Sequence, residues 1–217
     1  MRTEDLIADL AGRVTPVRPL PTPGVRAIGW LALAGACGVA SVAIVGARPD
    51  VMLRLAQPDY LWTAALALVA SIFAGLFALV LAVPGAERSP LLRLSTLAVL
   101  AVWMVTMVWA VVEAGLGLPF STDPHWPVCF ARGVAFSVVP VLALVVMIRR
   151  GMALSPGWTA AIAAIAAASM SALAVQIVCP LDDAGHAFLG HFIPVTAMAA
   201  LGIAARASFA GKTPASR

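Results

Sequence analysis

Six long apolar runs restrict the folds that are open to this sequence. They lie at approximately residues 27–47, 60–83, 92–116, 129–148, 158–178 and 187–205. Each run can cross the apolar core of a bilayer, which takes about 20 residues of helix. Backbone polar groups inside a bilayer must be hydrogen-bonded within the segment, so each run is expected to be helical. The sequence therefore predicts an all-α, polytopic membrane protein with six transmembrane helices.

The composition agrees with this class. Hydrophobic residues make up 62% of the chain and charged residues 11%, whereas an ordinary soluble domain is about 25% charged. The connections between the apolar runs are short, so no sizeable soluble domain is inserted. The predicted divisions are a cytoplasmic N-terminal segment (1–26), a transmembrane domain (27–206) and a disordered cytoplasmic tail (207–217).

The distribution of basic residues predicts the orientation. An even number of crossings places both termini on one side of the membrane. Of the 14 Lys and Arg residues, Arg48, Arg54 and Arg132 lie on the opposite side and all the others lie with the termini. The positive-inside rule therefore predicts cytoplasmic termini. On this interpretation the net charge of +4 reflects topology, and no direct contact with nucleic acid is predicted.

The N-terminal segment is the one sizeable polar stretch. Residues 1–14 are predicted to form a short helix with Thr3 as its N-cap and one apolar stripe, made of Leu6, Ile7, Leu10 and Val14. A helix this short is marginal alone in water, so it needs a surface to lie on. Lipid is one candidate surface, and a cytoplasmic protein partner is the other. A proline-rich linker at 16–23 joins this helix to the first span.

Two polar stretches, 123–129 and 179–191, face outward in this topology. They gather thiols, imidazoles and carboxylates in a chain that is otherwise poor in such groups. The candidates for a signal-sensing cluster are Cys129, Cys179, Asp183, His186 and His191. Cys129 and Cys179 lie at the outer ends of two different spans. They become neighbours if those spans pack side by side. Arg132 can pair with Glu113, Asp182 or Asp183 nearby.

Three chemistries remain open for this cluster. Cys129 and Cys179 can form a structural disulfide on an oxidising outer face. Thiolates and imidazoles also suit Zn²⁺ or Cd²⁺ as a sensed ligand. Alternatively, the two thiols can act as a redox switch. His186 and His191 are five residues apart, so on one helix they face different ways. One of them at most is expected to be a ligand, unless the helix begins after His186. Cys37 lies within the first span and is expected to be inert packing.

Enzyme motifs are missing from the sequence. It contains no CxxC, HExxH or GxSxG pattern, so no catalytic residue and no obligatory cofactor is predicted. A small metal-ion transporter is one alternative, but its helices should carry polar groups near mid-membrane, and these spans are apolar there. A structural membrane subunit with an outer disulfide is the other alternative.

Short motifs are spread along the whole chain. They are residues 1–7 with 16–18 at the start, Cys129, Pro140, 149–151 and Pro156 in the middle, and Cys179-Pro180 with Asp183, His186 and His191 near the end. Together these motifs resemble the NrsF family of bacterial inner-membrane anti-sigma factors. One departure is Gly190, where the family pattern leads us to expect an aromatic residue.

The resemblance implies a function that composition and periodicity do not. Members of this family hold an extracytoplasmic-function sigma factor at the inner membrane and release it under stress, with outer-face cysteines involved. For this chain the resemblance implies a multi-pass anti-sigma factor that binds its partner through Leu6, Ile7 and Leu10. A heavy metal or an oxidant would be sensed at Cys129 and Cys179. A homo-oligomer is compatible with the sequence.

Overall fold

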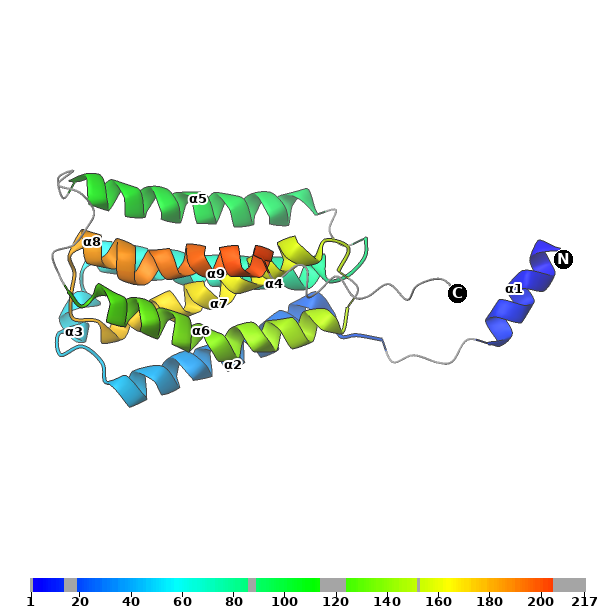
Figure 1. Ribbon diagram of the computed structural model, residues 1–217, viewed down its shortest axis with the longest axis horizontal. Coiled ribbons are helices and arrows are strands. Elements are labelled where there is room, and N and C mark those ends of the chain that lie inside the picture. The colour runs from blue at the N-terminus through cyan, green and yellow to red at the C-terminus, as the bar shows by residue number, and fades with distance from the viewer. Residues whose placement is uncertain (1, 14–18, 86–88, 114–123, 152, 205–217) are drawn as a thin grey trace.

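The fold is described from a computed structural model, which covers residues 2–13, 19–85, 89–113, 124–151 and 153–204. Every element in these ranges is a helix, which confirms the predicted all-α class (Figure 1). Within them, six helices are long and apolar enough to cross a membrane. They are α2 (Pro23–Val45), α4 (Pro58–Leu81), α5 (Pro90–Glu113), α6 (Trp126–Arg149), α7 (Pro156–Val178) and a last helix over Ala184–Ala204.

The last helix is built from three consecutive pieces. These are α8 (Ala184–His186), a π-helical turn η2 (Ala187–Phe192) and α9 (Ile193–Ala204). Two short helices complete the fold: α1 (Thr3–Gly12) near the N-terminus and α3 (Val51–Arg54) between α2 and α4. The predicted proline-rich linker lies partly, and the C-terminal tail wholly, outside the described residues.

The long helices begin earlier than the apolar runs predict, because proline starts most of them. Pro23, Pro58, Pro127 and Pro156 occupy the first turns of α2, α4, α6 and α7. The backbone N–H groups of a first turn have no partner within the helix, so proline is tolerated there. A boundary drawn from hydropathy alone leaves these more polar first turns out of the predicted spans.

α1 also begins differently from the prediction. Its N-cap is Arg2, whose backbone N–H donates to the Asp5 carboxylate at 3.2 Å, so the predicted cap at Thr3 is wrong by one residue. The helix buries none of its residues.

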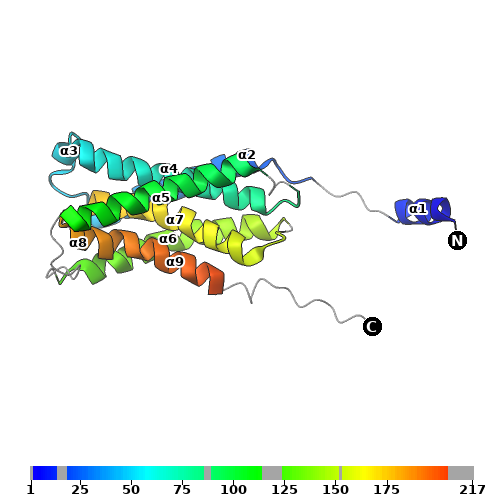
Figure 2. The same cartoon turned by 90° about the horizontal axis from the view of Figure 1, so that it is seen from above.

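α7 is the central helix of the bundle. It packs against α2, α4, α6 and α9, and 78% of its most apolar window is buried, compared with 11% for α5. The sequence of α7 is rich in alanine, and such small side chains let neighbouring helices approach closely within a membrane. α5 lies at the edge of the bundle (Figures 1 and 2).

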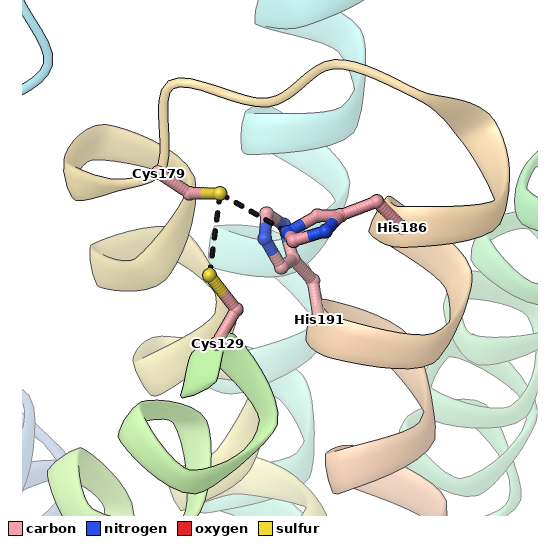
Figure 3. Close-up of side chains that lie close together, drawn as sticks. All are labelled: Cys129, Cys179, His186 and His191. Atoms are coloured by element: carbon pink, nitrogen blue, oxygen red, sulfur yellow. Dashed lines mark hydrogen bonds between the residues drawn. The ribbon is translucent and has the colours of Figure 1, made fainter. Parts of the chain in front are cut away.

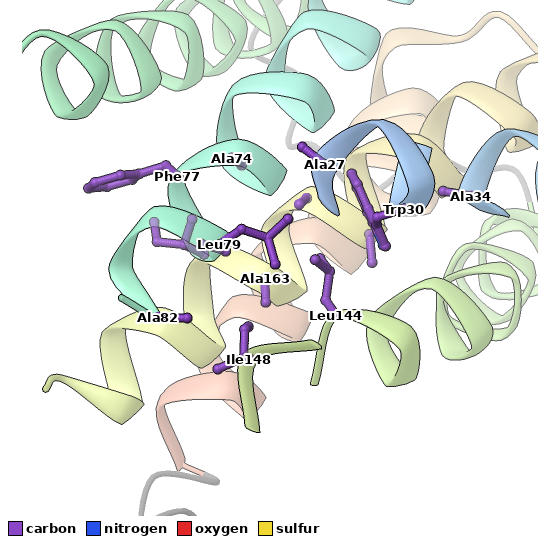
Figure 4. Close-up of a cluster of buried hydrophobic side chains, with 14 of the residues drawn as sticks. Ala27, Trp30, Ala34, Ala74, Phe77, Leu79, Ala82, Leu144, Ile148 and Ala163 are labelled. Carbon is purple, nitrogen blue, oxygen red and sulfur yellow. The ribbon is translucent and has the colours of Figure 1, made fainter. Parts of the chain in front are cut away.

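Trp30 joins α2 to two other helices in the core that Figure 4 shows. Its side chain is fully buried, and the indole N–H donates to the Pro140 carbonyl of α6 at 3.0 Å. Its ring also fills the space beside Gly75 of α4. One turn earlier, the guanidinium of Arg26 donates to the Met147 carbonyl. The first half of α2 is therefore held along α6.

The two ends of the bundle differ in what they present. α3 and α8 lie at one end (Figures 1 and 2). The start of α2 and the end of α9 lie at the other end, which is also where α1 extends away from the bundle. α1 and the α8 end therefore lie at opposite ends of the bundle.

Candidate functional site

Four side chains converge at the α8 end of the bundle and are referred to below as the Cys/His cluster (Figure 3). They are Cys129, Cys179, His186 and His191, and each offers a ligand atom that lies within 4.8 Å of the other three. Cys129 lies in the first turn of α6, and Cys179 caps the end of α7. His186 ends α8 and His191 lies in η2. Three membrane-spanning segments thus contribute to one site.

The π-helical turn explains why both histidines reach the cluster. The prediction that they face different ways assumes regular α-helix and is wrong. In a π-helix the backbone pairs residues five apart, and five is the spacing of His186 and His191. Their ring centroids are 5.4 Å apart, in an edge-to-face arrangement. Single π-turns occur frequently at functional sites.

The two cysteines are neighbours, as side-by-side packing of their helices requires. Their Sγ atoms are 3.3 Å apart, and the thiol of Cys129 donates to Cys179. No disulfide joins them in this structure. The Sγ of Cys179 also lies 3.2 Å from Nε2 of His186. Cys179 is therefore the central member of the cluster.

The surroundings of Cys179 favour its thiolate. The hydrogen bond from Cys129, followed by the interaction with His191, lowers the pKa of Cys179 well below its ordinary value, although burial acts in the opposite direction. The thiolate is the form of cysteine that binds metal and attacks electrophiles. Exposed fractions are small: 4% for Cys129, 1% for Cys179 and 0% for His186.

His191 contributes a second unusual feature. Its Nε2 atom is buried and has no hydrogen-bond partner among the described residues. Buried polar atoms are nearly always satisfied, so an orphan nitrogen needs an explanation. A cation held among two sulfur and two nitrogen atoms would supply the missing partner. This donor set is one that tetrahedral Zn²⁺ takes in proteins.

Asp183 was predicted to belong to the cluster, but it has a supporting position. Its carboxylate accepts the backbone N–H of His186 at 2.9 Å and so caps α8. It is not one of the four residues whose ligand atoms converge. Asp183 therefore holds the helix turn that carries His186.

A buried arginine beside the cluster escaped the sequence analysis. The side chain of Arg48 is 2% exposed and donates to both Asp50 and Asp182 at 2.7 Å. It also donates to the Pro180 carbonyl at 3.3 Å, immediately after Cys179. Hydrogen bonding to Arg48 lowers the pKa of Asp50 to about 2. Arg48 thus fastens the loop between α2 and α4 onto the segment that carries Cys179.

Asp182 has partners other than the predicted one. It pairs with Arg48 and with Arg54, whereas the sequence suggested Arg132. The backbone N–H of Arg48 also donates to the Ile177 carbonyl at the end of α7. Arg48 and Asp182 are 134 residues apart in the chain. The one available signal in the sequence was Arg48 two residues before Asp50, on the arginine-poor side of the predicted topology.

The remaining predicted residues are not members of the cluster. Glu113 is exposed at the end of α5, and Val14 and Asp123 lie outside the described residues. The apolar stripe of α1 is solvent-exposed: Leu6 by 40%, Ile7 by 60% and Leu10 by 56%. Nothing in the described bundle covers these three side chains.

One comparison with known proteins finds a match. A protein-family model described as a negative regulator of sigma F matches residues 10–209, which is most of the chain. No curated protein and no solved structure matches.

Proposed function

The chain belongs to the NrsF family of negative regulators of sigma F, and we propose that it is a membrane-bound anti-sigma factor that releases its partner when the Cys/His cluster meets a heavy metal or an oxidant. The partner is an extracytoplasmic-function sigma factor on the cytoplasmic side of a bacterial inner membrane. The protein acts as a regulator and carries out no catalysis. The convergence of two thiols and two imidazoles at 4.8 Å or less is the observation that carries the proposal.

The composition of the cluster favours soft cations as the signal. Zn²⁺ and Cd²⁺ bind thiolate and imidazole together, and hard cations such as Mg²⁺ do not. The Sγ atoms of Cys129 and Cys179 lie 3.3 Å apart, and a Zn–S bond is about 2.3 Å long. At the tetrahedral angle two such bonds place the sulfur atoms about 3.8 Å apart, so a cation between them would push them apart by roughly half an ångström. Metal binding thereby applies force between α6 and α7.

Oxidation would act on the same pair in the opposite direction. The two thiols would lose two protons and two electrons to a peroxide or another two-electron oxidant and form one S–S bond. That bond is about 2.05 Å long, so oxidation draws the helices together. Like the opposite displacement by a metal, this takes α6 and α7 away from the separation that they have at an Sγ–Sγ distance of 3.3 Å. The proximity of the two Sγ atoms supports this second signal.

The output would be read at the other end of the bundle. Cys129 lies in the first turn of α6, while α2 is attached to the second half of α6 through Trp30 and Arg26. A shift of α6 therefore moves the start of α2, which α1 precedes. Two packing states are required, and the signal must bind one of them more tightly.

α1 is the proposed docking element. Its three exposed apolar side chains form one stripe, and amphipathic helices of this kind bind in apolar grooves of partner proteins. Glu4 and Asp5 in its first turn disfavour an anionic lipid surface. A soluble partner therefore fits the helix better than the membrane does.

Co-purification tests the docking proposal. The detergent-solubilised protein should retain the sigma factor, and Ile7→Asp together with Leu10→Asp should abolish retention. Arg13→Gln changes an exposed residue just beyond the apolar stripe and should have little effect. Full retention by the Asp variant would refute docking through α1. A metal-ion transporter would instead show cation flux in proteoliposomes.

A further inference from the structure

A cavity of about 340 Å³ lies beside the Cys/His cluster. Its walls come from α4, α5, α7 and the last helix, and they include Tyr60, Thr63, Trp103, Ala110 and Gln176. Water occupies about 30 Å³ per molecule in the liquid, so a cation with roughly six waters needs about 200 Å³. The cavity is therefore large enough for a hydrated divalent cation.

His191 connects this cavity to the cluster. Among the described residues it is the member of the cluster that also lines the cavity wall. The other three members are 4% exposed or less. Its buried Nε2 atom has no hydrogen-bond partner in the part of the chain that the structure describes. A solute in the cavity therefore meets His191 before it meets either thiol.

The charges around the cavity favour cations. Asp59 and Glu113 line it, are exposed, and form no ion pair with a described residue. Arg48 and Arg54 also line it, but both are paired with Asp50 or Asp182. Together with Asp182, three carboxylates line the cavity, compared with two guanidinium groups. Carboxylates at the rim of a cleft with apolar walls raise the local concentration of cations.

We propose that this cavity is the access path to the Cys/His cluster, in which Asp59 and Glu113 attract cations and His191 takes over the cation before the thiols bind it. The proposal rests on the proposed sensing function of the cluster. It assigns a selectivity step to residues outside the cluster itself.

Thiol labelling of the full-length protein tests the path without any metal. In a Cys37→Ala background, the detergent-solubilised protein is treated with a cationic or an anionic methanethiosulfonate of similar size. The thiolate attacks the sulfenyl sulfur, a mixed disulfide forms and methanesulfinate leaves. Each labelling rate is divided by the rate at which the same reagent reacts with free cysteine. This removes the difference in intrinsic reactivity between the two reagents.

The expected result is selective access. The cationic reagent should label the cluster at least about tenfold faster than the anionic one at low salt. Asp59→Asn together with Glu113→Gln should remove most of that preference. Ala110→Trp, which fills the cavity, should slow both reagents about tenfold or more. Ala43→Trp is the matched control, because Ala43 lines a separate apolar groove between α2, α4 and α7 that shares no lining residue with this cavity, and it should change neither rate.

Unchanged labelling in Ala110→Trp, or equal rates for the two reagents in the wild type, would overturn the proposal. Cd²⁺ titration separates its failure from that of the sensing function. If Cd²⁺ fails to bind but Ala110→Trp blocks labelling, the path stands and metal sensing falls. If Cd²⁺ binds and Ala110→Trp slows neither its association nor labelling, sensing stands and the path falls.

Discussion

Gly190 lies where the last helix comes closest to α6. A Cβ atom there would be 3.2 Å from Cβ of Cys129, 3.4 Å from the Trp126 carbonyl oxygen and 3.5 Å from Nε2 of His186. The family pattern led us to expect an aromatic residue at this position, but the structure leaves no room for one without moving α6. Glycine therefore lets His186 and Cys129 approach each other.

Gly190→Ala should weaken metal binding while the protein still folds. The added methyl group would lie 3.2 Å from Cβ of Cys129, so Cys129 must shift away from the last helix by a few tenths of an ångström, whereas the 3.5 Å to His186 is ordinary contact. We expect the dissociation constant for Cd²⁺ to rise about tenfold, which corresponds to about 1.4 kcal/mol. Titration of the Cd–thiolate absorbance measures it. Gly29→Ala is the control, because a Cβ there meets nothing within 4 Å. Equal affinities in the two variants would contradict the role given to Gly190.

Asp182→Asn tests the attachment made by Arg48. The change leaves a buried guanidinium with a single carboxylate partner, and breaking buried pairs costs about 3–5 kcal/mol. Asp182 is partly exposed, with 33% of its side chain accessible, so we expect a smaller loss, about 1–2 kcal/mol. Thermal denaturation in detergent measures the change. Asp59→Asn, which breaks no ion pair, should leave stability unchanged, and equal stability of the two variants would argue against the attachment.

At the scale of helices, most of the structure could be predicted from sequence and one decisive part could not. A run of about 20 apolar residues in a bilayer has few options besides a helix, so the six spans were predictable. The π-turn at Ala187–Phe192 leaves no hydropathy signal, because it changes the backbone pairing and not the composition. Without that turn, the joint approach of His186 and His191 could not be predicted.

The Arg48 network escaped prediction for a different reason. Its partners come together only when α7 and the loop after α2 are placed in space, and local spacing carries no information about a contact spanning 134 residues. The sequence predicted that Cys129 and Cys179 meet only if their helices pack side by side, and it could not show that these helices do so.

Gly75→Ala tests the packing between α2 and α4. A Cβ at this position would lie 2.5 Å from Cζ3 of the buried Trp30 ring, so the ring or the helix must move. Overpacking of this kind costs about 1–3 kcal/mol. We expect a lower thermal stability in detergent, whereas Gly29→Ala should be neutral or slightly stabilising because alanine favours the helix. Equal melting of the two variants would show that Trp30 is not tightly held.

At the scale of the whole molecule, the fold separates the proposed input from the proposed output. The Cys/His cluster lies at the α8 end, and α1 extends from the other end (Figure 1). α6 runs between them, with Cys129 in its first turn and Met147 and Pro140 holding α2 further along. Coupling between such sites is a free energy and must act in both directions.

The affinity for the sigma factor, measured with and without Cd²⁺ in nanodiscs, tests this coupling most directly. Saturating Cd²⁺ should weaken sigma-factor binding by about tenfold or more, or about 1.4 kcal/mol, and the bound sigma factor should weaken Cd²⁺ binding by the same factor. Cys179→Ser should abolish both effects, and Cys37→Ser should preserve them. An affinity for the sigma factor that stays the same when Cd²⁺ fills the wild-type cluster would contradict the account.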